Sequence, residues 1–294
     1  MLAGVLPPLP TPFHADGSLA LERIAPDVER LAAAGVSGFV ALGSNGEGVH
    51  LSGEEASEVF AAVRRAAPPS LPVVGGAGRT STRETVEWSR RAADAGCAAV
   101  LVAPPSYYRG SMTPEVLRRH YEAVADASPV PVLLYNVPAN AVPIPVEVVA
   151  ALAPHPNVAG VKDSSGDIGQ LADLVLLKGA GKPFAVFAGN YGAFFPGLPL
   201  GIDGGILAAA NVAPRECCAI LSLSRGGKVG EAVEIHLRLL PLARLVTSRY
   251  GVPGLKAALD LLGASGGAPR LPLLPLGEAG RGEIAGALRR ASLI

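Results

Sequence analysis

Short apolar runs alternate with helical patterns along most of the chain, and this alternation constrains the fold more than any other feature. The eight runs lie at residues 4–12, 38–46, 71–78, 98–105, 130–138, 158–165, 184–190 and 204–212. They are continuously apolar, which is typical of parallel strands covered on both faces. Stretches with helical periodicity separate them, for example residues 52–67, where Ser52 and Glu55 have the spacing of a capping box.

Eight strands joined by short helical connections favour a closed (β/α)8 barrel, a TIM barrel, over the alternative of an open doubly wound sheet. After Pro214 the pattern changes to helices without strands between them. We therefore predict a barrel over residues 1–213 and, over residues 214–294, appended C-terminal helices that close and extend it. We expect Lys256, which lies in this second region, to pack or pair at its surface.

The composition argues against several classes of function. The chain of 294 residues is 49% hydrophobic and has a formal net charge of zero, whereas a nucleic-acid or membrane-surface partner requires a basic face. No apolar run reaches the roughly 18 residues of a membrane span, and the N-terminus lacks the pattern of a signal peptide, so we expect a cytoplasmic protein. The three cysteines and five histidines lack metal-ligand spacing, and we predict no metal site.

Lys162 is the first candidate for catalysis, because active sites of such barrels lie at the carboxyl ends of the strands. It ends an apolar run and is one of only five lysines. Burial favours the neutral form of an amine, and a neutral amine can attack a ketone and form a Schiff base. The alternative is an ion pair with Asp163, which is awkward because neighbours on a strand point to opposite faces.

Two further motifs follow strand ends. Tyr135 ends the run that precedes Lys162, so its phenol could transfer protons in the same pocket; the alternative is an amphipathic tyrosine at the barrel mouth. The sequence GSNGE at 43–47 has the spacing of neither a P-loop nor a dinucleotide site. The hydroxyl of Ser44 and the amide of Asn45 suit a small carboxylate, and a simple turn is the alternative.

Taken together, these residues resemble the family of pyruvate-dependent class I aldolases and synthases, which includes dihydrodipicolinate synthase, N-acetylneuraminate lyase and 4-hydroxy-2-oxoglutarate aldolase. The resemblance spans nearly the whole chain, through TPF at 11–13, GSNGE at 43–47, YYRG at 107–110, YNVP at 135–138, GVKDSSGD at 160–167, FAGN at 187–190 and GVPGLK at 251–256. It implies a barrel enzyme that acts on a 2-oxo acid and needs neither a metal nor an organic cofactor.

The resemblance also implies roles for individual residues. Lys162 would form the Schiff base with the keto carbon of a pyruvate unit, and Tyr135 would transfer protons. The 2-oxo acid would be held by residues around it, namely Ser44, Asn45, Gly189 and Ile206. Tyr108, or alternatively Tyr107, would complete a proton relay from a neighbouring subunit. That arrangement implies a homotetramer built as a dimer of dimers.

Two positions suggest which member of the family the chain is similar to. Synthases usually carry GTTGE instead of GSNGE, and an arginine where this chain has Asn140, which cannot offer a charged bidentate contact. The pattern is closest to 4-hydroxy-2-oxoglutarate aldolase, in which Ser164 is a further pocket residue. We therefore predict cleavage of 4-hydroxy-2-oxoglutarate to pyruvate and glyoxylate. The alternatives are a synthase that condenses pyruvate with aspartate semialdehyde, with Arg109 replacing the missing arginine, and a non-catalytic barrel that binds a 2-oxo acid.

Overall fold

The fold is a closed barrel of parallel strands. The computed structural model describes residues 2–179 and 181–294. Within them, eight parallel strands follow the order β1-β8-β7-β6-β5-β4-β3-β2. A parallel bridge joins Pro8 to Val40, and the Leu9 N–H donates to the Val40 carbonyl at 2.8 Å, so the chain after β1 meets β2 and closes the barrel. The predicted (β/α)8 barrel is confirmed.

The strands are shorter than the apolar runs that predicted them. They are β1 (Gly4–Val5), β2 (Phe39–Ala41), β3 (Val73–Gly76), β4 (Ala99–Val102), β5 (Val132–Asn136), β6 (Val158–Asp163), β7 (Ala185–Ala188) and β8 (Gly204–Gly205). β1 stops early because prolines at positions 7, 8, 10 and 12 have no N–H to donate to a ladder. The run at 204–212 turns into a short helix before it ends.

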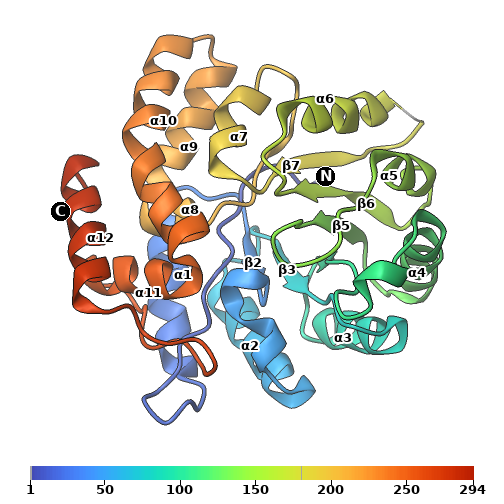
Figure 1. Ribbon diagram of the computed structural model, residues 1–294, viewed down its shortest axis with the longest axis horizontal. Coiled ribbons are helices and arrows are strands. Elements are labelled where there is room, and N and C mark those ends of the chain that lie inside the picture. The colour runs from blue at the N-terminus through green and yellow to red at the C-terminus, as the bar shows by residue number, and fades with distance from the viewer. Residues whose placement is uncertain (1, 180) are drawn as a thin grey trace.

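Helices surround the barrel (Figure 1). They are α1 (Ile24–Ala33), α2 (Gly53–Ala66), α3 (Thr82–Asp94), α4 (Pro114–Ala127), α5 (Val146–Leu152), α6 (Ile168–Leu176), α7 (Tyr191–Gly197), α8 (Ala209–Val212), α9 (Pro214–Arg225), α10 (Val229–Arg244), α11 (Gly251–Leu261) and α12 (Glu278–Arg290). The capping box predicted at the start of α2 is confirmed, because the Ser52 hydroxyl accepts from the Glu55 N–H and the Ser52 N–H donates to the Glu55 carboxylate.

Two apolar cores flank the strands. The outer core lies between the strands and the helices and includes Phe39 and Ala41 of β2. The inner core fills the barrel and includes Val40, which lies between those two residues in the same strand. The strands are therefore buried on both faces, which explains why their sequences are continuously apolar.

The C-terminal helices cover one side of the barrel. Figure 1 shows α10, α11 and α12 gathered there, opposite α4 and α5. α9 packs against β1, while a π-helical turn, Leu245–Arg249, joins α10 to α11. The predicted division of the chain at residue 213 stays a prediction. None of the helices in the described residues is long and apolar enough to cross a bilayer.

Candidate active site

A large cavity of about 1250 Å³ opens at the carboxyl ends of the strands. Predicted site residues contribute to its wall, namely Ser44, Asn45, Tyr135, Asn140, Lys162, Ser164, Gly189 and Ile206. These residues come from five strand ends that are far apart in the sequence. The structure therefore brings most of the predicted site into one cavity, at the end of the barrel where it was expected.

Lys162 points into the barrel from the middle of the sheet. Its register partners are Tyr135 on β5 and Phe187 on β7, both of which belong to the inner core. Only 4% of Lys162 is exposed. The residue ends the inner apolar layer with an amine that faces the cavity, and in the described part of the chain it makes no ion pair.

Asp163 turns to the opposite face of β6, as the alternation of a strand requires. Its carboxylate accepts hydrogen bonds from the Asn136 amide at 2.5 Å, the Ser165 hydroxyl at 2.5 Å and the Gln170 amide at 2.8 Å. These contacts tie β6 to β5 and to the first turn of α6. The alternative reading of Lys162, an ion pair with Asp163, is therefore wrong.

Tyr135 lies against the amine and connects it to the GSNGE turn. The Lys162 Nζ is 4.1 Å from the centre of the Tyr135 ring, and the Tyr135 Oη is 3.3 Å from the Ser44 Oγ. Burial raises the pKa of Tyr135, but the charge of Lys162 and the hydrogen bond with Ser44 outweigh burial, so the pKa lies below its ordinary value. A phenol with a lowered pKa is suited to proton transfer.

Gly189, directly after β7, makes room for the lysine. A Cβ at this position would lie 2.0 Å from the Ser164 Oγ and 2.8 Å from the Lys162 Cε. Any side chain at position 189 would therefore collide with both residues. Ile206 lies beside this point, with its N–H donating to the Ala188 carbonyl at 2.9 Å.

The YYRG segment lies outside the cavity wall. Tyr107 and Tyr108 are 77% and 70% exposed, with ring centres 5.0 Å apart. Arg109 donates to the Ala141 carbonyl at 3.1 Å, next to Asn140, but its guanidinium does not line the cavity. A role for Tyr108 at the site needs a neighbouring subunit, and this stays a prediction.

The expectation that Lys256 lies at the surface of the C-terminal helices is wrong. Lys256 is 1% exposed, and its Nζ lies 2.7 Å from the Oε1 of Glu47, the last residue of the GSNGE turn. The sequence carries a signal for this contact, because both partners lie in motifs, Glu47 in GSNGE and Lys256 in GVPGLK. What it did not show is that α11 brings the second motif against the first.

The C-terminal helices supply a wall of the cavity that sequence reasoning missed. The residues involved are Leu240, Ala243, Arg244, Thr247, Ser248 and Tyr250. Two of them, Thr247 and Ser248, belong to the π-helical turn between α10 and α11. Such turns are rare and frequently occur at functional sites, so the π-helix was a structural signal that the sequence did not reveal.

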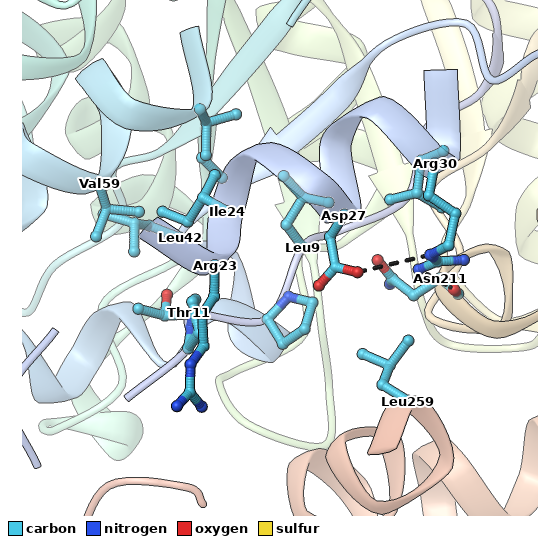
Figure 2. A pocket seen from close by; sticks show the side chains of 15 residues that line it. Leu9, Thr11, Arg23, Ile24, Asp27, Arg30, Leu42, Val59, Asn211 and Leu259 are labelled. Atoms are coloured by element: carbon cyan, nitrogen blue, oxygen red, sulfur yellow. Dashed lines mark hydrogen bonds and ion pairs between the residues drawn. The ribbon is translucent and has the colours of Figure 1, made fainter. Parts of the chain in front are cut away.

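A second, much smaller cavity lies between α1, α2 and α11 (Figure 2). Its apolar wall includes Leu9, Ile24 and Leu259, and it also contains Asp27, which lies 3.5 Å from Arg30. Its volume of about 20 Å³ holds roughly one water molecule. This cavity is too small for a substrate. In the described residues, no three histidine, cysteine, aspartate or glutamate side chains are grouped as metal ligands.

Comparisons with known proteins agree with the family resemblance of the motifs that form this site. The model of the dihydrodipicolinate synthetase family matches residues 1–291. The chain is 36% identical to a 4-hydroxy-tetrahydrodipicolinate synthase of Methanothrix thermoacetophila, covering 99% of this chain and 98% of that protein. It is also 36% identical to a probable mitochondrial 4-hydroxy-2-oxoglutarate aldolase of Emericella nidulans, covering 99% of this chain and 94% of that protein.

Comparison with solved structures points to the same family. A crystal structure of dihydrodipicolinate synthase from Acinetobacter baumannii in complex with pyruvate superimposes with a TM-score of 0.93 at 31% identity, and the match covers 100% of both chains. The chain belongs to the dihydrodipicolinate synthetase family and is one of its class I aldolases or synthases, enzymes that form a Schiff base on a lysine.

Proposed function

We propose that the protein cleaves 4-hydroxy-2-oxoglutarate to pyruvate and glyoxylate and that Lys162 is its Schiff-base lysine. The observation that carries the proposal is the grouping of a buried amine, a phenol and a hydroxyl in one cavity, with 4.1 Å between the Lys162 Nζ and the Tyr135 ring centre and 3.3 Å between the Tyr135 and Ser44 oxygens. This grouping supports catalysis rather than simple binding of a 2-oxo acid.

The proposed reaction begins when the Lys162 amine adds to the C2 ketone. Loss of water gives an iminium ion, which withdraws electrons from the neighbouring bonds. In the loss of water, Tyr135 gives its phenolic proton to the departing hydroxyl; the resulting phenolate then takes the proton of the C4 hydroxyl, the C3–C4 bond breaks, and the electron pair of that bond forms the enamine while glyoxylate leaves. Protonation of the enamine at C3 and hydrolysis release pyruvate and restore the amine.

The residues around the lysine would hold the 2-oxo acid. Ser44 and Asn45 line the cavity, with the Ser44 hydroxyl 3.3 Å from the Tyr135 oxygen, and the hydroxyl of Ser164 lies beside Gly189. Ile206 forms an apolar wall. Uncharged donors of this kind orient a carboxylate by hydrogen bonds while the lysine remains free to react.

The cavity offers a cation for a second acidic group. Arg244 lines it and is exposed, and no carboxylate of the described residues forms an ion pair with its guanidinium. The other arginine of the wall, Arg79, is engaged with the Gly48 carbonyl at 2.7 Å and with the Trp88 ring. We assign the distal carboxylate of the substrate to Arg244, and we expect Arg244→Leu to raise KM while borohydride trapping of pyruvate is retained.

Asn140 favours the aldolase over the synthase. It lines the cavity at the position where a synthase usually has an arginine, and Arg109 does not replace that arginine in the cavity wall. The synthase remains the second candidate, because the chain is also 36% identical to a protein named 4-hydroxy-tetrahydrodipicolinate synthase. Both reactions would use the same lysine.

Substrate profiling and chemical trapping test the proposal together. We expect a higher kcat/KM for cleavage of 4-hydroxy-2-oxoglutarate than for condensation of pyruvate with aspartate semialdehyde. Borohydride with pyruvate should add mass at Lys162, and Lys162→Ala should abolish both turnover and trapping. Lys178→Ala is the matched control, because Lys178 lies outside the cavity and pairs with Asp203. A Lys162→Ala protein with normal kcat would refute the assignment.

The exposed tyrosines support a further proposal on assembly. Tyr107 and Tyr108 form an edge-to-face aromatic pair that is more than two thirds exposed on this chain. We propose that they meet a second copy of the chain in a homotetramer and that Tyr108 completes the neighbouring site. Light scattering of the purified protein, with Tyr108→Phe compared for kcat, tests this; a fully active monomer would contradict it.

A further inference from the structure

A buried ion pair holds the last residue of the GSNGE turn, Glu47, which also lies in the cavity wall. The side chains of Lys256 and Glu47 are 1% and 0% exposed, and their charged atoms are 2.7 Å apart. Lys256 also donates to the Ala268 carbonyl at 2.9 Å. Breaking a buried pair of this kind leaves an uncompensated charge, so both partners strongly resist separation.

The turn itself is held in an unusual backbone conformation. Leu42 and Glu47 stand on either side of residues 43–46 and have φ angles of 57° and 53°. Residues other than glycine rarely adopt this left-handed region, and they stay there only where surrounding contacts enforce it. For Glu47 those contacts are made by its carboxylate. The residues between the two strained positions include Ser44 and Asn45, which line the cavity.

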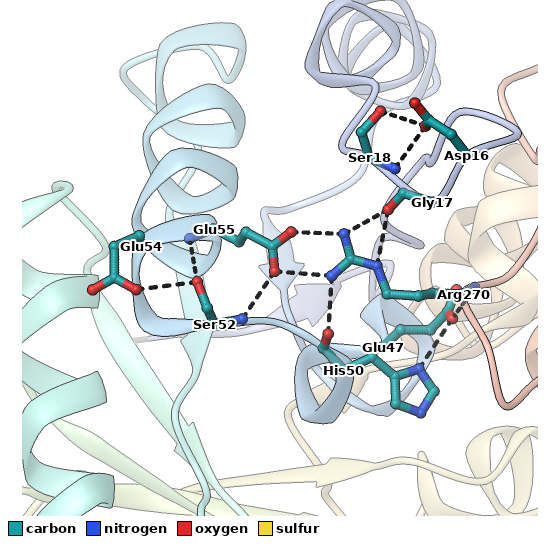
Figure 3. Close-up of polar contacts among 9 residues, drawn as sticks. All are labelled: Asp16, Gly17, Ser18, Glu47, His50, Ser52, Glu54, Glu55 and Arg270. Atoms are coloured by element: carbon teal, nitrogen blue, oxygen red, sulfur yellow. Dashed lines mark hydrogen bonds and ion pairs between the residues drawn. The ribbon is translucent and has the colours of Figure 1, made fainter.

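Arg270 fixes the same carboxylate from a second direction (Figure 3). Its backbone N–H donates to the Glu47 Oε2 at 2.9 Å. Its guanidinium forms two hydrogen bonds with the Glu55 carboxylate, at 2.6 and 2.8 Å, and donates to the His50 carbonyl at 2.9 Å. Because Glu55 belongs to the capping box of α2, this network connects the turn to a helix of the barrel.

Phe13, in the TPF motif, lies between the two cations. The Lys256 Nζ is 4.6 Å and the Arg270 Cζ 4.5 Å from the centre of its ring. Next to it, the Thr11 hydroxyl donates to the Gly46 carbonyl within the turn at 2.6 Å. TPF, GSNGE and GVPGLK are therefore parts of one support, although about 240 residues separate the first from the last.

We propose that the Lys256–Glu47 ion pair positions the turn that presents Ser44 to Tyr135, so that Lys256 on α11 controls the geometry of the site through Glu47 although Lys256 does not line the cavity. The inference rests on the proposed function in that Lys162 forms the Schiff base and Tyr135 transfers protons. Lys256 and Glu47 are positioning residues, and their effect passes through the 3.3 Å contact between the Ser44 and Tyr135 oxygens.

A crystal structure of Lys256→Met tests the geometry without reference to activity. We expect the Ser44 hydroxyl to lose its contact with Tyr135 and Glu47 to leave the left-handed region. An unchanged turn in this variant would overturn the inference, whatever the enzyme does. If Lys256→Met does not fold, Glu47→Gln combined with Lys256→Met replaces it, because this pair of changes leaves no buried charge uncompensated.

A kinetic arm uses the exchange of pyruvate methyl hydrogens in D2O, followed by proton NMR. The lysine–pyruvate iminium gives a C3 proton to Tyr135 and takes a deuteron back, so the exchange needs no aldehyde. We expect Lys256→Met to slow exchange at least about tenfold, because small displacements of catalytic groups have effects of this size or larger. We expect the same loss in the double variant with Glu47→Gln, even though its melting temperature recovers.

Two controls separate positioning from a general loss of stability. Lys178→Met removes another lysine–carboxylate pair, in which the Lys178 Nζ lies 2.9 Å from the Asp203 Oδ1. This variant should keep the exchange rate within twofold of that of the unmodified protein. The variant that combines Ser44→Ala with Lys256→Met should exchange no more slowly than the slower of the two single variants, because both changes remove the same contact, that between Ser44 and Tyr135. Multiplicative losses would overturn the inference.

Absence of pyruvate trapping at Lys162 in the unmodified protein would instead refute the proposed function, and the crystal structure would still decide the role of the pair.

Discussion

The stability of the protein should depend strongly on either partner of the Lys256–Glu47 pair but weakly on the pair as a whole. In Lys256→Met, the Glu47 carboxylate remains buried with 0% of its side chain exposed and keeps only the contacts of its other oxygen, with the Arg270 N–H and His50. Removing one partner of a buried pair costs about 3–5 kcal/mol, whereas neutral replacements of both are close to neutral.

The assay is urea unfolding followed by circular dichroism at one protein concentration, for the unmodified protein, Lys256→Met, Glu47→Gln and the double variant. We expect each single change to lower the free energy of unfolding by about 3 kcal/mol or more and the double variant to lie within about 1 kcal/mol of the original. Lys228→Met, in an exposed pair with Glu231, should change little. Additive losses in the double variant would show that the two side chains are not coupled and would refute the reasoning.

Three further predictions concern proton transfer, substrate choice and pH. Tyr135→Phe should lower kcat by about 10²–10⁴-fold while borohydride still traps pyruvate at Lys162; a kcat within threefold would contradict the role of the phenol. Asn140→Arg should shift the ratio of kcat/KM values toward aspartate semialdehyde by about tenfold or more, because it adds a charged bidentate contact. His120 is 5% exposed, and burial lowers its pKa from 6.5 to about 4. The unfolded chain therefore takes up a proton first, and the folded protein should lose roughly 3 kcal/mol of stability between pH 6.5 and pH 4. His120→Phe should remove this part of the pH dependence in urea unfolding, and an unchanged profile would contradict it.

The chemistry at the strand ends was predictable from local patterns. Lys162 and Tyr135 ended consecutive apolar runs, and parallel strands place their carboxyl ends together. Because side chains alternate between the two faces of a strand, the sequence alone also predicted that Lys162 and Asp163 point to opposite faces. The ends of the strands were less predictable, because Pro7 and Pro8 remove hydrogen-bond donors and residues 209–212 pair with no strand but form a helix.

The sequence by itself determined the barrel and the reacting residues, because both follow from short-range periodicity and from the side chains at the end of each period. Only the tertiary structure decided how the site is supported and bounded. The contacts of Glu47 with Lys256 and Arg270 cross more than 200 residues, and the π-helical turn brings the C-terminal helices over the cavity. Contacts of this range leave no periodic pattern, since they depend on how α11 and the segment after it pack against the finished barrel.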